Sequence, residues 1–288
     1  MIRTAPRLWG QNEPKPSMRR GRRYHRPVNA ALLLRLALAP ALVAIATLAA
    51  RRWGPAAGGW VASLPVVAGP VLLVFIADHG PAFGAQAGAS ATLGLVSLAV
   101  FTTVYARVAR SGRTWAVCLL TGWLSFLLTT AVLALVAVPA IYALAAALVA
   151  FQLCRVALGR VPAPAGTGRR LPADIPLRML AALVMVIGLS VVSGPLGSRV
   201  SGLVAPFPII GSVMAAFTHA SRGREALQGY SATLLRGLPS FALFTATVAF
   251  ALQPLGLVPS FALGSLVAAL SHAVLIAWSV RPGGRHLS

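Results

Sequence analysis

The chain has 288 residues, of which 58% are apolar and only 10% are charged, and this composition leaves too little polar surface to coat a soluble globule. The formal net charge of +21 arises from 25 lysine and arginine residues against four acids. Because these basic residues lie in a tail and in short loops between apolar runs, they indicate membrane topology and argue against nucleic acid binding. The expected partner is therefore the lipid bilayer, with its anionic headgroups.

The first 28 residues form a basic, proline-containing tail. Eight lysine and arginine residues lie in this segment, which cannot bury a core and is predicted to be disordered. The apolar run that follows is long enough for a membrane span and lacks a small-residue cleavage site, so we expect an uncleaved first span and not a signal peptide.

Nine apolar runs of about membrane-spanning length follow the tail. They cover residues 31–50, 59–77, 85–106, 115–135, 137–157, 176–193, 200–219, 229–252 and 257–280. The division within residues 115–157 is the least marked, because this stretch contains no acid, no lysine and no polar turn. It is about twice as long as one crossing needs, and Pro139 near its middle cannot continue a regular helix, so two antiparallel spans are favoured.

The sequence repeats itself. Shifted by 143 residues, segment 31–106 aligns with segment 174–249 without a gap and with 19 identities in 76 positions. Chance would give about a tenth in a chain so rich in Ala and Leu, so an internal duplication is indicated. Matches other than Ala and Leu include Arg35 with Arg178, Gly54 with Gly197, Gly59 with Gly202, Pro65 with Pro208, Gly80 with Gly223, Gly94 with Gly237, Ser97 with Ser240, Phe101 with Phe244 and Thr102 with Thr245.

The predicted fold is an all-α, polytopic membrane helix bundle of about nine transmembrane helices. Its expected parts are a disordered tail (1–28), a four-span repeat (29–135), a linking span and loop (136–173) and a second four-span repeat (174–288). If residues 115–157 cross twice, an odd number of spans separates matching residues and the second repeat is inverted, as in many secondary transporters.

Loop charges leave the orientation open. With the amino terminus inside, the cytoplasmic side would hold the tail and Arg199, whereas most other loop arginines would lie outside, against the positive-inside rule. A single crossing by residues 115–157 would remove most of this conflict and make the repeats parallel. The length of that stretch favours the inverted arrangement.

A proline interrupts the second apolar run of each repeat. The segments are Gly59–Pro65 and Gly202–Pro208, which end at the matching residues Pro65 and Pro208. A proline inside a span leaves a backbone carbonyl free, which membrane helices accept only where protein or water satisfies it. Broken helices at matching positions of two repeats indicate a midplane binding site, and a simple packing kink is the alternative interpretation.

Arg35 and Arg178 lie at equivalent places, about one turn into the first span of each repeat. An arginine at that depth either snorkels to the headgroups or binds an anionic substrate or lipid phosphate. Asp174 lies four residues before Arg178 and could pair with it as a helix neighbour. These two arginines are therefore candidates for a substrate path.

Four other titratable residues are candidates for charge or proton coupling. Asp78 is the only acid close to a span in the first half, and His219 and His272 lie within apolar runs of the second half. Interfacial capping is the alternative role for Asp78. Arg236 lies inside the eighth run, where a charge indicates a functional site unless backbone carbonyls or Gln228 pair with it.

Small and hydroxylated residues recur along the third span of the first repeat and in its counterpart. Ser97 and Thr102 match Ser240 and Thr245. Small residues at this spacing allow close helix packing, and hydroxyls that face a cavity are compatible with the same pattern. These four residues are included among the candidates for the substrate path.

Motifs of soluble enzymes are absent from the sequence, which contains no Walker loop, dinucleotide fingerprint, zincin, kinase or nucleophile-elbow motif. Cys118 and Cys154 lie inside apolar runs, far from any second Cys or His at metal-ligand spacing. We therefore expect no enzymatic activity, no catalytic residue, no metal and no cofactor.

The segments Leu203–Pro208, Thr218–His219 and Arg222–Gly223 resemble a pattern of the GlpM-like family of small bacterial inner-membrane proteins. The repeat is also similar to related four-span families with a Gly-Gly-hydrophobic-Ala-x-Pro signature. The resemblance covers about a third of the chain, which departs from the family in its tandem arrangement and added linking span. It implies a multi-pass protein of the bacterial inner membrane and a link to alginate exopolysaccharide production, without catalytic residues.

These patterns together favour a secondary transporter or permease-like protein for an unidentified small solute or lipid. The path would be lined by the helices of Pro65 and Pro208, with Arg236 and Asp78 as the charged candidates. The alternative is a non-transporting accessory protein of cell-envelope or exopolysaccharide assembly. Transport predicts a water-accessible midplane cavity, whereas an accessory role predicts a solid bundle with an outer face for a partner.

Overall fold

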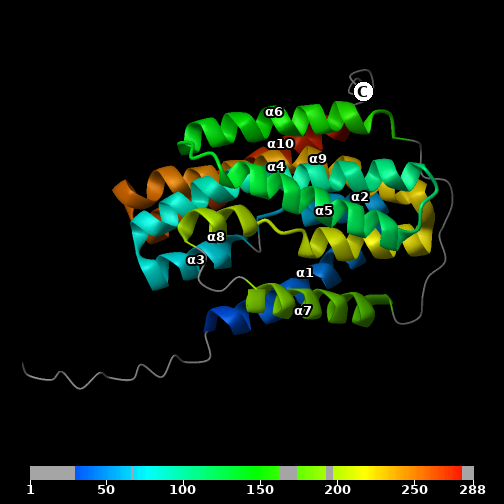
Figure 1. Ribbon diagram of the computed structural model, residues 1–288, viewed down its shortest axis with the longest axis horizontal. Coiled ribbons are helices and arrows are strands. Elements are labelled where there is room, and N and C mark those ends of the chain that lie inside the picture. Colours follow the sequence, from blue (N-terminus) through cyan, green and yellow to red (C-terminus); the bar gives the residue numbers. More distant parts are fainter. Residues whose placement is uncertain (1–29, 66–67, 162–173, 193–196, 281–288) are drawn as a thin grey trace, which may run out of the picture.

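The computed structural model describes residues 30–65, 68–161, 174–192 and 197–280, and these residues form helices and no strand. The helices are α1 (Ala30–Trp53), α2 (Pro55–Ala62), α3 (Ala68–His79), α4 (Pro81–Arg110), α5 (Trp115–Ala134), α6 (Ala140–Leu158), α7 (Asp174–Val192), α8 (Ser198–Val204), α9 (Ile209–Leu255) and α10 (Leu257–Val280). They lie alongside one another in an elongated bundle, with α1 and α7 at one edge and α6 at the opposite edge (Figure 1). The predicted all-helical class is thus confirmed for the described residues.

Five helical segments of the described part are long and apolar enough to cross a membrane. They are Pro81–Arg110, Trp115–Ala134, Ala140–Leu158, Ser198–Leu255 and Leu257–Ser279. The outer helices α5, α6 and α10 expose large apolar side chains along their length, among them Leu124, Val149 and Leu266. Because soluble proteins rarely expose such continuous apolar surface, these features are those of a membrane protein.

The long helices α4 and α9 form the centre of the bundle. In their most apolar stretches 72% and 67% of the residues are buried, against 22% to 28% in α5, α6 and α10. The main core cluster lies around these two helices and includes the fully buried rings of Phe101, Tyr105 and Tyr230. The protein therefore buries its central helices among its own side chains and leaves its outer helices facing the surroundings.

Two of the apolar runs do not form single helices. The run over 59–77 is divided between α2 and α3, and the run over 200–219 is divided between α8 and the beginning of α9. At 1.5 Å per residue the eight residues of α2 and the seven of α8 are each far too short to cross a bilayer core about 30 Å thick. The described residues thus contain two broken helices, at the prolines where the sequence predicted interruptions.

Helix α9 consists of two segments, residues 209–222 and 224–255, which meet at a sharp turn. Gly223 at this turn has φ 79° and ψ 178°. Gly80, which lies 143 residues earlier and separates α3 from α4, has φ 88° and ψ 174°. This region of backbone conformation is essentially confined to glycine. In Figure 1 the α3–α4 connection lies at the left end of the bundle and the yellow turn within α9 at the right end.

Residues 115–157 form two helices, α5 and α6, as their length suggested. The chain leaves helix α5 after Ala134 and enters α6 at Ala140, directly after Pro139. Proline suits this place, because the first turn of a helix does not use its N–H groups. Figure 1 shows α6 running back in the direction opposite to α5.

The short helices each pack against a long helix that is distant in the sequence. Helix α2 packs against α9, and α8 packs against α4. A Cβ added to Gly59 of α2 would meet the backbone of Tyr230 and Leu234, and one added to Gly202 of α8 would meet the backbone of Ala87. The absence of a side chain therefore allows both contacts, as small residues do in membrane helix packing.

Candidate functional site

A proline lies at each of the two helix breaks. Pro65 O accepts a hydrogen bond from Gly69 N at 3.1 Å, and Pro208 O accepts one from Ser212 N at 2.7 Å. Because proline has no N–H and its ring clashes with a continuous helix, α2 and α8 end a few residues before these positions. At the first break Ser63 Oγ donates to Trp60 O at 2.7 Å, which satisfies a carbonyl at the end of α2.

A cavity of about 40 Å³ lies between the two breaks. Its lining consists of Ala62, Leu64, Leu98, Ala205, Pro206, Phe207, Pro208, Ile209, Ile210, Gly211, Leu234 and Phe241. Leu64 comes from the first break, the segment 205–208 forms the second, and Leu98 and Leu234 come from the central helices. The fold thus brings together two breaks that lie far apart in the sequence, around a small and apolar space.

Aromatic residues hold the second break against α5. The ring of Phe207 lies 5.3 Å from that of Phe126 and 6.3 Å from that of Trp123, measured between centroids. Trp123 Nε1 donates to Ser212 Oγ at 2.9 Å, in the first turn of α9. Helix α5, which lies outside the two central helices, thus holds the second break in place through these contacts.

The four hydroxylated candidates do not line this cavity. Ser97 Oγ of α4 accepts a hydrogen bond from Thr130 Oγ1 of α5 at 2.9 Å, and Ser240 Oγ of α9 lies 2.9 Å from His272 Nδ1 of α10. The other two are Thr102, which donates to Leu98 O at 2.8 Å, and Thr245, whose Oγ1 lies 2.8 Å from Thr92 Oγ1. In the structure Ser97, Ser240 and Thr245 thus join neighbouring helices, whereas Thr102 bonds within α4.

Arg178 is buried, with 4% of its surface exposed. Its guanidinium carbon lies 4.9 Å from the centre of the Phe217 ring, and Nη1 lies 3.6 Å from Met214 Sδ, which places the charge between α7 and the first segment of α9. A cation over an aromatic face is attracted by the ring quadrupole. Arg178 therefore packs inside the protein and does not snorkel away from it.

Arg236 is half-buried on the second segment of α9 and lies near enough to Arg155 of α6 for their charges to interact. Gln228, which the sequence offered as a partner for Arg236, instead bonds to the end of α4. Its Oε1 accepts from Arg110 Nε at 3.1 Å, and its Nε2 donates to Ala106 O at 2.7 Å. The structure thus uses Gln228 to join α4 and α9.

His219 lies half-buried on the first segment of α9, with its ring centroid 6.0 Å from that of Tyr105. Among the described residues, its Nδ1 atom is buried without a hydrogen-bond partner, as is the hydroxyl of Tyr230. Buried polar atoms without partners are costly and uncommon, so these two side chains hold unused hydrogen-bonding capacity.

The side chains of Arg35, Asp78 and Asp174 lie outside the described residues, and with them the expected Asp174–Arg178 pair. In the described part no group of three or more His, Cys, Asp or Glu residues is placed to hold a metal ion. Sequence reasoning treated Arg199 only as a loop charge, whereas the structure places it in a pocket. The signal that could have found it is the internal alignment, in which Arg199 faces Ala56.

Neither a family model, nor a curated protein, nor a solved structure matches this chain.

Proposed function

We propose that this chain is a multi-pass protein of the bacterial inner membrane, built from two inverted four-span repeats and a linking span, that carries a small solute or lipid past its two broken helices. Each broken helix would count as one crossing, with α2 and α3 forming one and α8 and residues 209–222 the other. Together with α1, α4, α5, α6, α7, residues 224–255 and α10, this assignment accounts for all the elements in the described part.

Matching helix boundaries support the repeat. Helix α2 begins at Pro55 and α8 at Ser198, and the turns at Gly80 and Gly223 are also 143 residues apart. The places of the two turns at opposite ends of the bundle support the inversion (Figure 1). With one linking span between two four-span repeats, an odd number of crossings separates matching residues. The second repeat is then inverted relative to the first.

The observation that carries the proposal is that the short helix of each half packs against the long helix of the other half. Helix α2 packs on the long helix of the second half, α8 packs on that of the first, and the two breaks meet at one cavity. In secondary transporters with inverted repeats, substrate sites lie where broken helices of the two halves meet near the bilayer midplane. Exchange of the two halves between equivalent conformations would open this place alternately to either side.

A non-transporting accessory protein of the cell envelope, in line with the GlpM-like resemblance, is the second candidate. The small volume of the cavity, about 40 Å³, favours it, since sites for drug-sized ligands measure about 300–1,000 Å³. Such a protein would keep this cavity closed and act through its outer face.

Cysteine modification at the cavity distinguishes the two candidates. Leu64→Cys is placed in a background in which the buried Cys118 and Cys154 are replaced by alanine. If the halves alternate, a membrane-impermeant methanethiosulfonate added to vesicles of either orientation is expected to modify residue 64 from both sides. The measurement is the fraction of protein that resists later labelling with a fluorescent maleimide.

Leu72→Cys serves as the matched control, because Leu72 is fully buried on α3 but does not line the cavity. It is expected to stay unmodified from both sides. Equal protection of positions 64 and 72 from both sides would exclude the transport proposal and leave the accessory role.

A further inference from the structure

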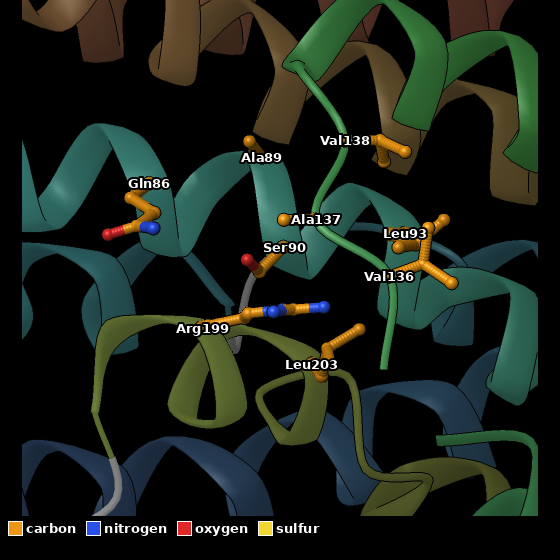
Figure 2. A pocket seen from close by; sticks show the side chains of 9 residues that line it. All are labelled: Gln86, Ala89, Ser90, Leu93, Val136, Ala137, Val138, Arg199 and Leu203. Carbon is orange, nitrogen blue, oxygen red and sulfur yellow. The ribbon is translucent and has the colours of Figure 1, made fainter. Parts of the chain in front are cut away.

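A second pocket lies along α8 and shares no lining residue with the cavity between the breaks. It is bounded by α4, by the connection between α5 and α6, and by α8, and its volume is about 50 Å³. Figure 2 shows Arg199 of α8 extending along this pocket, with Ser90 of α4 above it and Val136 at its far end. The pocket therefore contains the charged head of an arginine among mostly apolar walls.

The guanidinium of Arg199 is incompletely satisfied. Its Nη2 atom is buried and has no hydrogen-bond partner among the described residues. Burying part of a charged group without a partner is among the most costly arrangements in a protein. A buried guanidinium nitrogen without a partner is available to bind an anion.

The protein does not supply that anion from the pocket itself. None of the nine residues that line it is an aspartate or glutamate. The polar side chains in the lining besides Arg199 are Gln86 and Ser90. Gln86 is held in place by Ser198 Oγ, which donates to its Oε1 at 2.6 Å and so leaves the amide nitrogen of Gln86 available as a donor.

The size of the pocket limits what it can hold. A buried water needs about 10–15 Å³ by this kind of measure, so about 50 Å³ admits a group of a few atoms. The planar guanidinium donates two parallel hydrogen bonds, a geometry that matches the oxygens of phosphate. A tetrahedral oxyanion therefore fits both the volume and the donors.

The internal alignment shows that this pocket belongs to one half of the chain. The residues 143 positions before Arg199 and after Ser90 are Ala56 and Thr233. There Thr233 Oγ1 donates to Ala56 O at 2.8 Å, so that the two helices are joined directly. In the half that contains α8, Arg199 stands in place of the alanine, and a pocket lies where the other half has this direct contact. Because the other half packs its helices without an arginine, helix packing alone does not require Arg199.

We propose that Arg199, with Ser90 and Gln86, binds a phosphate-type oxyanion in this pocket. The anion is either the phosphate of a phospholipid headgroup or free inorganic phosphate, since the same donors serve both. This site does not depend on whether the protein transports a solute, because it lies apart from the cavity between the breaks.

The test uses the full-length protein in a neutral detergent, with Arg199→Gln compared with wild type. Native mass spectrometry measures retention of phosphatidylglycerol against diacylglycerol, which lacks the phosphate, and thermal unfolding measures stabilisation by sodium phosphate against sodium chloride at equal ionic strength. We expect the Kd for the binding anion to rise at least about tenfold in Arg199→Gln, equivalent to about 1.4 kcal/mol. Selective retention of phosphatidylglycerol identifies a headgroup, and stabilisation by sodium phosphate alone identifies the free anion.

Arg113→Gln is the control for a general loss of positive charge, because Arg113 is exposed between α4 and α5. It is expected to leave the Kd within about twofold of wild type. Ala137→Phe narrows the pocket without changing its charge and should weaken anion binding as Arg199→Gln does. This second variant provides the test if Arg199→Gln fails to fold. Binding of neither probe by the wild type, or equal binding by wild type and Ala137→Phe, would overturn the proposal.

Discussion

Replacing Gly202 by alanine is expected to lower the free energy of unfolding by about 2 kcal/mol or more, as overpacking of tight contacts does. The new Cβ would lie 2.7 Å from Ser90 Cβ and 3.0 Å from Ala87 Cα, and closer still to the carbonyl oxygen of Ala87. Because backbone atoms of α4 cannot move aside as a flexible side chain can, α8 must shift away from α4. Gly59→Ala should have a similar effect at the contact between α2 and α9, where the backbone nitrogen of Leu234 would be 2.9 Å from the new Cβ.

The measurement is the melting temperature of the detergent-solubilised protein, with a decrease of roughly 4 °C or more expected for either variant. Gly229→Ala is the matched control on α9, since a Cβ at Gly229 would meet nothing within 4 Å. Alanine there should be neutral or stabilise by up to about 1 kcal/mol through its higher helix propensity. Melting temperatures that fall equally for Gly202→Ala and Gly229→Ala would show that the close contacts are not as described.

Leu124→Arg is expected to reduce the amount of membrane-inserted protein severely. Leu124 is 57% exposed at the middle of α5, on an outer helix whose apolar side chains face the surroundings. If those surroundings are lipid, an arginine at the centre of the span costs about 2.5–3.5 kcal/mol on insertion scales. The measurement is the ratio of membrane-integrated to aggregated or degraded protein after expression.

Leu135→Arg is the control for this substitution, because Leu135 is 83% exposed but lies directly after α5. An arginine at the end of a span can extend its charge to the headgroups, so this variant should insert as the wild type does. Equal tolerance of both substitutions would mean that α5 faces water, and it would contradict assignment to a membrane.

Local chemistry explains which parts of the fold the sequence could predict. The helical class followed from apolar runs without strand periodicity, and the break near Pro139 followed from the inability of proline to continue a helix. The same property located the interruptions at Pro65 and Pro208. These features depend on a few neighbouring residues, so one sequence is sufficient to reveal them.

Contacts between distant segments could not be predicted in the same way. Whether Arg178 reaches the headgroups or packs on Phe217 depends on how α7 meets α9, and the partner of Gln228 depends on the position of Arg110 at the end of α4. The pairing of Ser240 with His272 also requires knowledge of which helix faces which. Each side chain has several possible partners in the sequence, and only the packing selects one.

The relation of the two halves in the membrane is tested most directly by side-specific labelling of two single cysteines. Ala82→Cys and Arg224→Cys place them at exposed positions in the first turn of α4 and directly after Gly223, in a background with Cys118 and Cys154 replaced by alanine. With two inverted repeats, a membrane-impermeant maleimide added to intact spheroplasts should label one of these cysteines, and the other should react only after the membrane is permeabilised. Labelling of both from the same side would contradict the inverted arrangement on which the proposed exchange between the halves depends.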